Sequence, residues 1–241
     1  MLDVHPPHSA THTWRDFFIH IATICIGLLI AVGLEQTVEA VHRSAERRDL
    51  LHDIHVECEE NLRALDSDIA SYLARSDWEA SAAAVLRAAP VVHGSIAVTL
   101  PAAPPVLFAP APSRAVWTLA RASGKVALVP ENLAQVFDRV DFHGEQWQRD
   151  TVRIYDSAAV ISRFRVTIGT AVKPGATLHL TPAQRDQVLE ALATNIYDER
   201  NATVFSAYWK ADSQAVLDGV AVRRDMEPYI LRAGAALPAQ K

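Results

Sequence analysis

Apolar residues recur along most of this chain at the spacing of a helix, and near the start they form an unbroken run. From Phe17 to Leu34 about eighteen consecutive residues carry no formal charge, which at about 1.5 Å per residue gives roughly 27 Å, close to the hydrocarbon thickness of a bilayer. The stretch Trp14 to Leu34 therefore predicts a transmembrane helix. The residues expected to lie in the membrane span are Trp14, Phe17, Phe18, Ile19, Ile21, Ile24, Ile26, Leu28, Leu29, Ile30, Val32 and Leu34.

A cleaved signal peptide is the alternative interpretation of this run. Signal peptides typically have an apolar region of about 7 to 15 residues followed by a cleavage site of small residues. The run here is longer, and no A-x-A pattern follows it. Within the run His20, Gly27 and Ala31 are candidate contacts to a partner helix, because polar side chains seldom face lipid and small residues one turn apart let helices approach closely.

The segment after Leu34 has the pattern of one helical face, with no Gly or Pro before Pro90. We expect the membrane helix to continue without a break into an extramembrane helix that ends near Ser76. Asp77 is expected to cap a separate short helix over residues 78–89. The apolar residues that define the face are Val38, Val41, Ala45, Leu51, Ile54, Cys58, Leu62, Leu65, Ile69 and Tyr72.

The remainder alternates loops and helices. Residues 90–112 predict a Pro-rich loop with one short edge strand. A helix capped by Ser113 follows and stops at Gly124, and the K-V-A-L-V segment after it is interpreted as extended. Two long helices are expected over 130–168 and 181–219, the second opened by the capping box T-P-A-Q.

These elements predict a mainly α protein: an N-terminal transmembrane helix continuous with a long helix, then an antiparallel helical bundle with a Pro-rich loop. Residues 1–13 are expected to form an irregular N-terminal tail and 14–34 the transmembrane helix. Residues 35–222 form the extramembrane bundle, with the loop at 90–112, and 223–241 a C-terminal tail.

Composition adds few constraints. The 241 residues are 50% hydrophobic and 21% charged with a net charge of -5, enough for one sizeable domain beside the anchor. This acidic balance argues against a nucleic-acid partner, which would need a concentrated basic face. The two cysteines, Cys25 and Cys58, lie too far apart along a helical stretch for a disulfide.

The chain shows no recognised catalytic signature. Phosphate-binding, dinucleotide-binding, zinc and hydrolase motifs are missing from the sequence. Glu39 is the one Glu followed three residues later by His, at His42, whereas a di-metal bundle requires two such pairs. The acidic residues Asp198, Glu199 and Asp212, and the D-F-H-G-E segment at 141–145, are interpreted as polar helix surface. We therefore expect no enzyme, no cofactor, no metal site and no small-molecule substrate.

Three tryptophans on the predicted helices leave two interpretations open. Trp117, Trp147 and Trp209 are either ordinary core aromatics or contacts to a partner protein. Side-chain exposure distinguishes the two.

The block W-R-D-F-F-I-H-I-A-T-I-C-I-G-L-L-I-A-V-G-L-E-Q-T-V-E at 14–39 resembles a widespread group of uncharacterised bacterial single-span membrane proteins with a G-L-L-I-A-like span. The element W-T-L-A-R-A-S-G at 117–124 is similar to one that recurs in that group. The resemblance covers the anchor and one short helix, and it implies the bacterial inner membrane, a periplasmic helical domain and no known activity. Arg43, Arg47 and Arg48 after the span favour the opposite orientation, by a small margin.

Three functional hypotheses follow. The leading one is a membrane-anchored structural or accessory subunit, whose span docks against integral membrane proteins while the bundle braces them. The first alternative is an extracytoplasmic ligand-binding or sensory domain, although only about thirteen residues lie beyond the span to carry an output. The second alternative is an enzyme with an unrecognised site.

Overall fold

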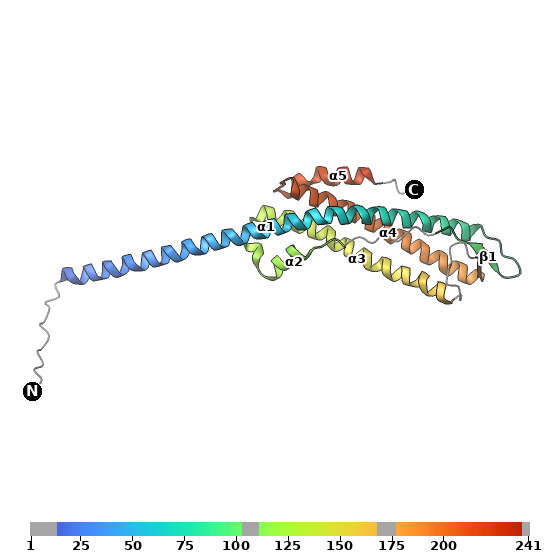
Figure 1. Ribbon diagram of the computed structural model, residues 1–241, viewed down its shortest axis with the longest axis horizontal. Helices are drawn as coiled ribbons and strands as arrows, with labels where there is room; N and C mark the ends of the chain where they lie inside the picture. The colour runs from blue at the N-terminus through green and yellow to red at the C-terminus, as the bar shows by residue number, and fades with distance from the viewer. Residues whose placement is uncertain (1–13, 103–110, 168–176, 238–241) are drawn as a thin grey trace, which may run out of the picture. The chain divides into compact units, whose positions relative to one another are not determined.

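The structure is a computed structural model that describes residues 14–102, 111–167 and 177–237, with side chains to 159 in the second range. It is mainly helical, as predicted, and the chain divides into two compact units, Met1–Asp49 and Leu50–Lys241 (Figure 1). In chain order the elements are α1 (Trp14–Ala88), β1 (Ile96–Thr99), α2 (Ala115–Ala122), the 3₁₀ helix η1 (Lys125–Leu128), α3 (Glu131–Thr167), β2 (Thr177–Leu180), α4 (Pro182–Leu217), the 3₁₀ helix η2 (Arg223–Met226) and α5 (Glu227–Ala236).

Helix α1 is longer than predicted. It runs on to Ala88, so the expected break near Ser76 and the cap at Asp77 are both wrong. The Ser76 hydroxyl bonds back to the carbonyl of Leu73 at 3.1 Å, within its own helix. A capping residue type does not end a helix whose apolar face continues, and here Leu86 is still fully buried.

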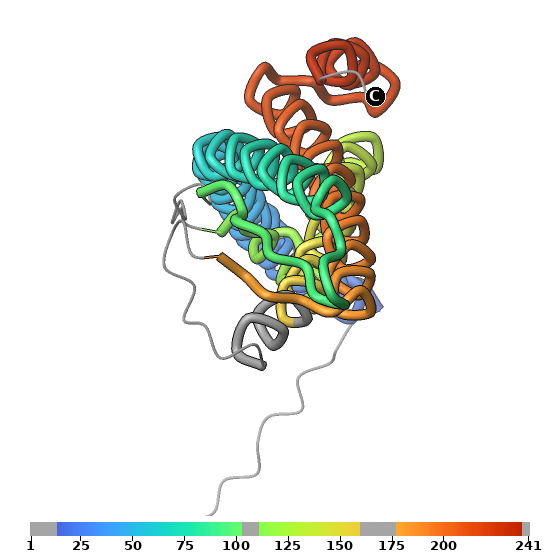
Figure 2. The backbone as a smooth tube through the Cα atoms, turned by 90° about the vertical axis from the view of Figure 1, so that its right-hand side faces the viewer, coloured from blue at the N-terminus to red at the C-terminus, as the bar shows by residue number. Residues whose placement is uncertain are grey.

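Three long helices lie side by side in the second unit (Figures 1 and 2). Ion pairs join α1 to α4: Asp66 pairs with Lys210, and further along α1 Arg75 lies 2.8 Å from Glu199. As the residue number rises in α1 it falls in α4, so the two helices run antiparallel. Helix α3 also runs antiparallel to α4.

Helix α2 is held at its start by α1. The Glu57 carboxylate accepts hydrogen bonds from the Ser113 hydroxyl at 2.6 Å and from the Val116 amide at 3.2 Å. The Asn61 side chain exchanges two 2.7 Å hydrogen bonds with the Ser113 backbone. The N-cap position belongs to Arg114 and not to Ser113 as predicted. The Ser113 hydroxyl nevertheless accepts from the first helical amide, that of Ala115, at 3.1 Å, and the Glu57 carboxylate satisfies the next one, that of Val116.

A two-stranded antiparallel sheet closes the end of the second unit. The strand expected within residues 90–112 is β1, and it pairs with β2, which the sequence did not indicate. Ile96 and Val98 face inward with Leu178 and Leu180, and all four are buried against α1 and α4. Residues 103–110 of the predicted loop lie outside the described residues.

The long helices near the C-terminus begin and end close to the predicted positions. The capping box is confirmed, since the Thr181 hydroxyl accepts from the Gln184 amide at 3.2 Å and the Gln184 side chain accepts from the Thr181 amide at 2.8 Å. Residues 168–176, between the two predicted helices, lie outside the described residues.

Two other expectations are wrong. The segment after Gly124 is the 3₁₀ helix η1 and not an extended piece, because Gly124 turns the chain at φ +76° and its carbonyl accepts from the Ala127 amide at 3.2 Å. Residues 223–241, expected to be a tail, contain η2 and α5. Helix α5 is tied to the end of α4 by a 2.8 Å hydrogen bond from the Tyr229 hydroxyl to Asp218.

Candidate functional site

The predicted membrane segment is fully exposed in the first unit. Helix α1 is long and apolar enough to cross a membrane, and none of its most apolar window is buried. All the large residues assigned to the span, from Trp14 to Leu34, have exposed side chains. At about 100° of rotation per residue, His20, Gly27 and Ala31 fall within about 40° of one another, so they share one face of the helix. A Cβ placed on Gly27 meets nothing within 4 Å.

The three predicted tryptophan contacts are core residues. Trp117 packs edge to face on Phe137 with ring centroids 5.1 Å apart, and Trp147 lies against Trp209 at 5.7 Å. All three tryptophans are buried in the second unit, so the interpretation as a partner surface is wrong.

Four of the acidic residues interpreted as helix surface are buried, which corrects that prediction for Asp141, Asp198, Glu199 and Asp212. Glu145 is partly exposed, as the interpretation requires. One group, which we call the paired network, consists of two carboxylates with four basic partners. Asp141 accepts from Arg114 Nε at 2.8 Å and from Arg121. Asp212, with no exposed surface, accepts from His143 Nδ1 at 2.6 Å, and Arg139 Nε lies 3.3 Å from its other oxygen. The members are Asp141, Asp212, Arg114, Arg121, Arg139 and His143.

Gly144 lets this network pack closely. A Cβ at that position would lie 2.7 Å from Arg114 Cδ and 2.8 Å from Trp209 Cζ2, closer than van der Waals contact allows. The glycine therefore sits where α3 meets both the Arg114 side chain and the Trp209 ring.

A second group of acidic residues, four of them buried and Asp68 half-buried, lies on α1, α3 and α4. We call it the acidic seam, and it consists of Asp68, Glu79, Asp150, Asp198 and Glu199. Burial, and to a smaller extent the Glu79 carboxylate, raises the pKa of Glu199 to about 8, and Arg75 opposes the shift. Burial also raises the pKa of Asp68 to about 6.

Two members of the acidic seam, Asp150 on α3 and Asp198 on α4, lie near the same arginine, Arg153. Arg153 Nη1 donates to Asp150 Oδ1 at 3.1 Å. Burial raises the pKa of Asp150, Arg153 opposes the shift, and the Asp198 carboxylate adds to it. Burial likewise raises the pKa of Asp198, again against the charge of Arg153. The Arg153 guanidinium, which is largely exposed, is thus the basic group that opposes the raised pKa values of both buried carboxylates.

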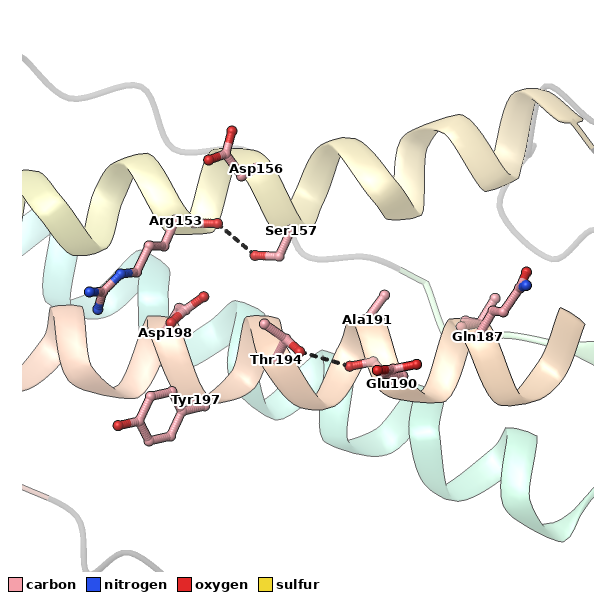
Figure 3. Close-up of a pocket in the computed structure, with 10 residues that line it drawn as sticks. Arg153, Asp156, Ser157, Gln187, Glu190, Ala191, Thr194, Tyr197 and Asp198 are labelled. Atoms are coloured by element: carbon pink, nitrogen blue, oxygen red, sulfur yellow. Dashed lines mark hydrogen bonds between the residues drawn. The ribbon is translucent and has the colours of Figure 1, made fainter.

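A cavity of about 790 Å³ lies between α3 and α4 beside this part of the seam (Figure 3). Its buried lining residues are Ser157, Val188, Ala191 and Asp198. Its exposed lining residues are Arg153, Asp156, Gln187, Glu190, Thr194 and Tyr197. Room remains here because both helices carry small side chains where they face one another, such as Ser157 and Ala191.

The polar groups in and beside the cavity are candidates for two roles, as metal ligands and as a nucleophile with its base. Among the residues that the structure describes, no group of three or more potential metal ligands converges. The Ser157 hydroxyl donates at 2.8 Å to the Asn195 side-chain oxygen, which in turn is held through its amide by Glu79. An amide oxygen is a poor proton acceptor, so Ser157 lacks the base that a nucleophile requires. Of the acids with raised pKa values, only Asp198 lines the cavity.

No protein-family model, no curated protein and no solved structure matches this chain.

Proposed function

We propose that this protein is a single-span accessory subunit of the bacterial inner membrane, whose span binds an integral membrane protein. In this proposal residues 14–34 cross the bilayer, and the domain from Leu50 onward is an extramembrane helical bundle that braces the partner at the periplasmic surface. The periplasmic placement follows the resemblance of residues 14–39 to bacterial single-span proteins.

The observation that carries the proposal is the shared face of His20, Gly27 and Ala31 on an exposed apolar helix. Membrane helices associate through close van der Waals packing at small residues and through polar side chains that bond across the contact. Gly27 and Ala31 are one turn apart, and His20 lies two turns before Gly27 on the same face. A polar side chain in lipid is costly unless it meets a partner.

The second support is that one helix serves both the span and the domain. Helix α1 includes the apolar run, and from Leu50 onward it supplies buried residues to the core of the second unit, among them Ile54 and Cys58. A subunit that only needed a tether would not require its membrane helix to continue into the core.

Paired substitutions on opposite faces of the span test the proposal. Gly27→Ile and Ala31→Ile should reduce the partner recovered with the full-length protein by about tenfold or more, since a lost packing contact of about 1.4 kcal/mol is worth that factor. Gly33→Ile adds the same side chain about 120° from Gly27 around the helix, outside the shared face, and should leave recovery unchanged. A photo-reactive residue at Ile24 should cross-link the partner, and one at Ile26 should not.

Two results would contradict the accessory role. One is a wild-type protein that runs alone as a monomer in mild detergent with no membrane partner. The other is an equal loss of partner in the Gly27→Ile and Gly33→Ile proteins, because contact through one face predicts a difference.

A second candidate function is extracytoplasmic ligand binding, which the cavity between α3 and α4 favours. Ligand pockets of proteins typically have volumes of about 300 to 1,000 Å³ and few polar groups on an apolar lining. The cavity of about 790 Å³ matches this description. A small molecule that raises the melting temperature of the full-length protein in a concentration-dependent way would support this function.

A further inference from the structure

Acidic residues outnumber basic ones among the described residues that line the cavity between α3 and α4. Three of these lining residues are acidic and one is basic. Behind them, the acidic seam adds further carboxylates, among which Glu199 pairs with Arg75 and Asp150 with Arg153, whose side chains are 37% and 60% exposed. A positive charge placed in the cavity would therefore enter a region of negative potential.

Asp198 is the lining group that would meet such a charge. Its residue is 94% buried, and no described residue makes a hydrogen bond with its carboxylate. In Figure 3 the carboxylate points from α4 toward α3, into the space that Arg153 also enters. Asp150 stands behind it with one oxygen buried and without a hydrogen bond. The Asp198 carboxylate faces the cavity, so a donor or a cation placed there would satisfy it through a charge-assisted hydrogen bond.

We propose that this cavity binds an organic cation, whose ammonium or amidinium group contacts the Asp198 carboxylate and whose apolar part lies over Val188 and Ala191. This inference rests on the ligand-binding function and is independent of the membrane partner.

The lining selects this ligand class over the alternatives. An anion would have Arg153 as its only cationic contact among the described lining residues, and would face Asp156, Glu190 and Asp198. A bare metal ion would find no set of three ligands in the part of the chain that the structure describes. An organic cation satisfies the carboxylate by a charge-assisted hydrogen bond and uses the apolar wall as well.

The experiment compares three probes that share an aromatic ring and differ in charge: 2-phenylethylamine, 2-phenylethanol and phenylacetate. Each is titrated calorimetrically into the full-length protein in nanodiscs of zwitterionic lipid, with empty nanodiscs as the blank. The amine should bind saturably, at least about tenfold more tightly than the alcohol, which corresponds to one charge-assisted contact. The carboxylate probe should bind most weakly.

Variants locate the binding. Asp198→Asn should weaken amine binding about tenfold, removing most of its advantage over the alcohol. Asp186→Asn makes the same charge change on an exposed side chain outside the lining and should leave amine binding unchanged. Ala191→Leu fills the cavity and should weaken the amine and the alcohol alike. The Asn variant should melt no lower than the wild type, since it removes a buried charge.

Each remaining outcome overturns the inference. If the amine and the alcohol bind equally and Ala191→Leu weakens both, the cavity binds ligands but does not select a cation. If Asp198→Asn and Asp186→Asn weaken the amine equally, the effect is general electrostatics. If the amine does not bind above the empty-nanodisc blank, the cation site is refuted, whereas the ligand-binding function still depends on a wider screen.

Discussion

The paired network and the acidic seam both include carboxylates of α3 and α4, but they differ in how many basic partners each buried carboxylate has. In the paired network each carboxylate has at least two basic neighbours, as Asp212 has in His143 and Arg139. In the acidic seam Asp150 and Asp198 share one arginine, and burial raises the pKa of both. The balanced end of the domain is thus suited to holding helices together, and the unbalanced end to receiving a charge from outside.

The largest effect is expected from breaking the paired network. Asp212→Ala removes the carboxylate shared by His143 and Arg139 and should destabilise the protein by about 3 to 5 kcal/mol, since a buried cation is left without its partner. Thermal melting followed by circular dichroism measures the loss. Asp225→Ala, which breaks a surface pair with Arg224, should cost less than about 0.5 kcal/mol. A melting temperature for Asp212→Ala equal to that of this control would show that the network holds nothing together.

The next effect concerns the close packing beside that network. Gly144→Ala should destabilise the protein by about 2 kcal/mol, because the added methyl overlaps Arg114 and the Trp209 ring. Gly234→Ala in α5 is the matched control. Its Cβ would meet Tyr208 at 3.5 Å, an ordinary contact, and alanine favours a helix over glycine by up to about 1 kcal/mol. Stability changes of the same sign and size would contradict the packing described around Gly144.

The acidic seam should respond to pH through Glu199. Its folded-state pKa of about 8 lies above the ordinary 4.5, so its contribution to stability is full below about pH 4.5 and is lost as the pH rises through about 8. Glu199→Gln stays neutral and should be several kcal/mol more stable than the wild type at pH 8.5, about 1.4 kcal/mol for each unit by which the pKa is raised, with little difference at pH 4.5. Melting curves across this range measure the difference. Glu145→Gln controls for the change in net charge, and an identical pH profile for the two variants would refute the assignment.

The smallest effect is expected from one neutral hydrogen bond beside the acidic seam. The Tyr72 hydroxyl lies 3.2 Å from the Thr151 hydroxyl and joins α1 to α3. Tyr72→Phe should cost about 0.5 to 1.5 kcal/mol, the usual net value of such a bond. Tyr155→Phe removes a hydroxyl from a side chain that is 70% exposed and should change nothing measurable. If both substitutions are neutral, this bond makes no contribution to stability.

The periodicity of apolar residues was sufficient to predict the long helices, because each buries a stripe at spacings of three and four. The same search for apolar residues wrongly predicted that Asp198, Glu199 and Asp212 lie on the helix surface. In α4 the buried face continues from Leu192 through Asn195 and Glu199 to Ala202, again at spacings of three and four. A search for apolar residues alone continues from Leu192 to Ile196 and Phe205, which are only half-buried. The spacing of all residues, polar ones included, follows the buried face and would have indicated a polar interior.

Elements that depend on distant partners could not be predicted from local sequence. Strand β2 has only four residues, and it exists because β1, about eighty positions earlier, pairs with it. The cavity has a similar origin, since its shape depends on how α3 lies against α4. The end of α1 at Ala88 reflects the burial of Leu86 by the sheet residues, which outweighs the capping preference of Asp77.

The Glu57 and Asn61 contacts to the start of α2 have a consequence for the order of folding. An isolated helix of eight residues is unstable in water, because nucleation costs more than so few hydrogen bonds return. The groups that satisfy its Val116 amide and fix Ser113 lie more than fifty residues earlier in the chain. Helix α2 should therefore remain unstructured during synthesis until α1 has formed, and its appearance would report that residues 50–65 have reached their native conformation.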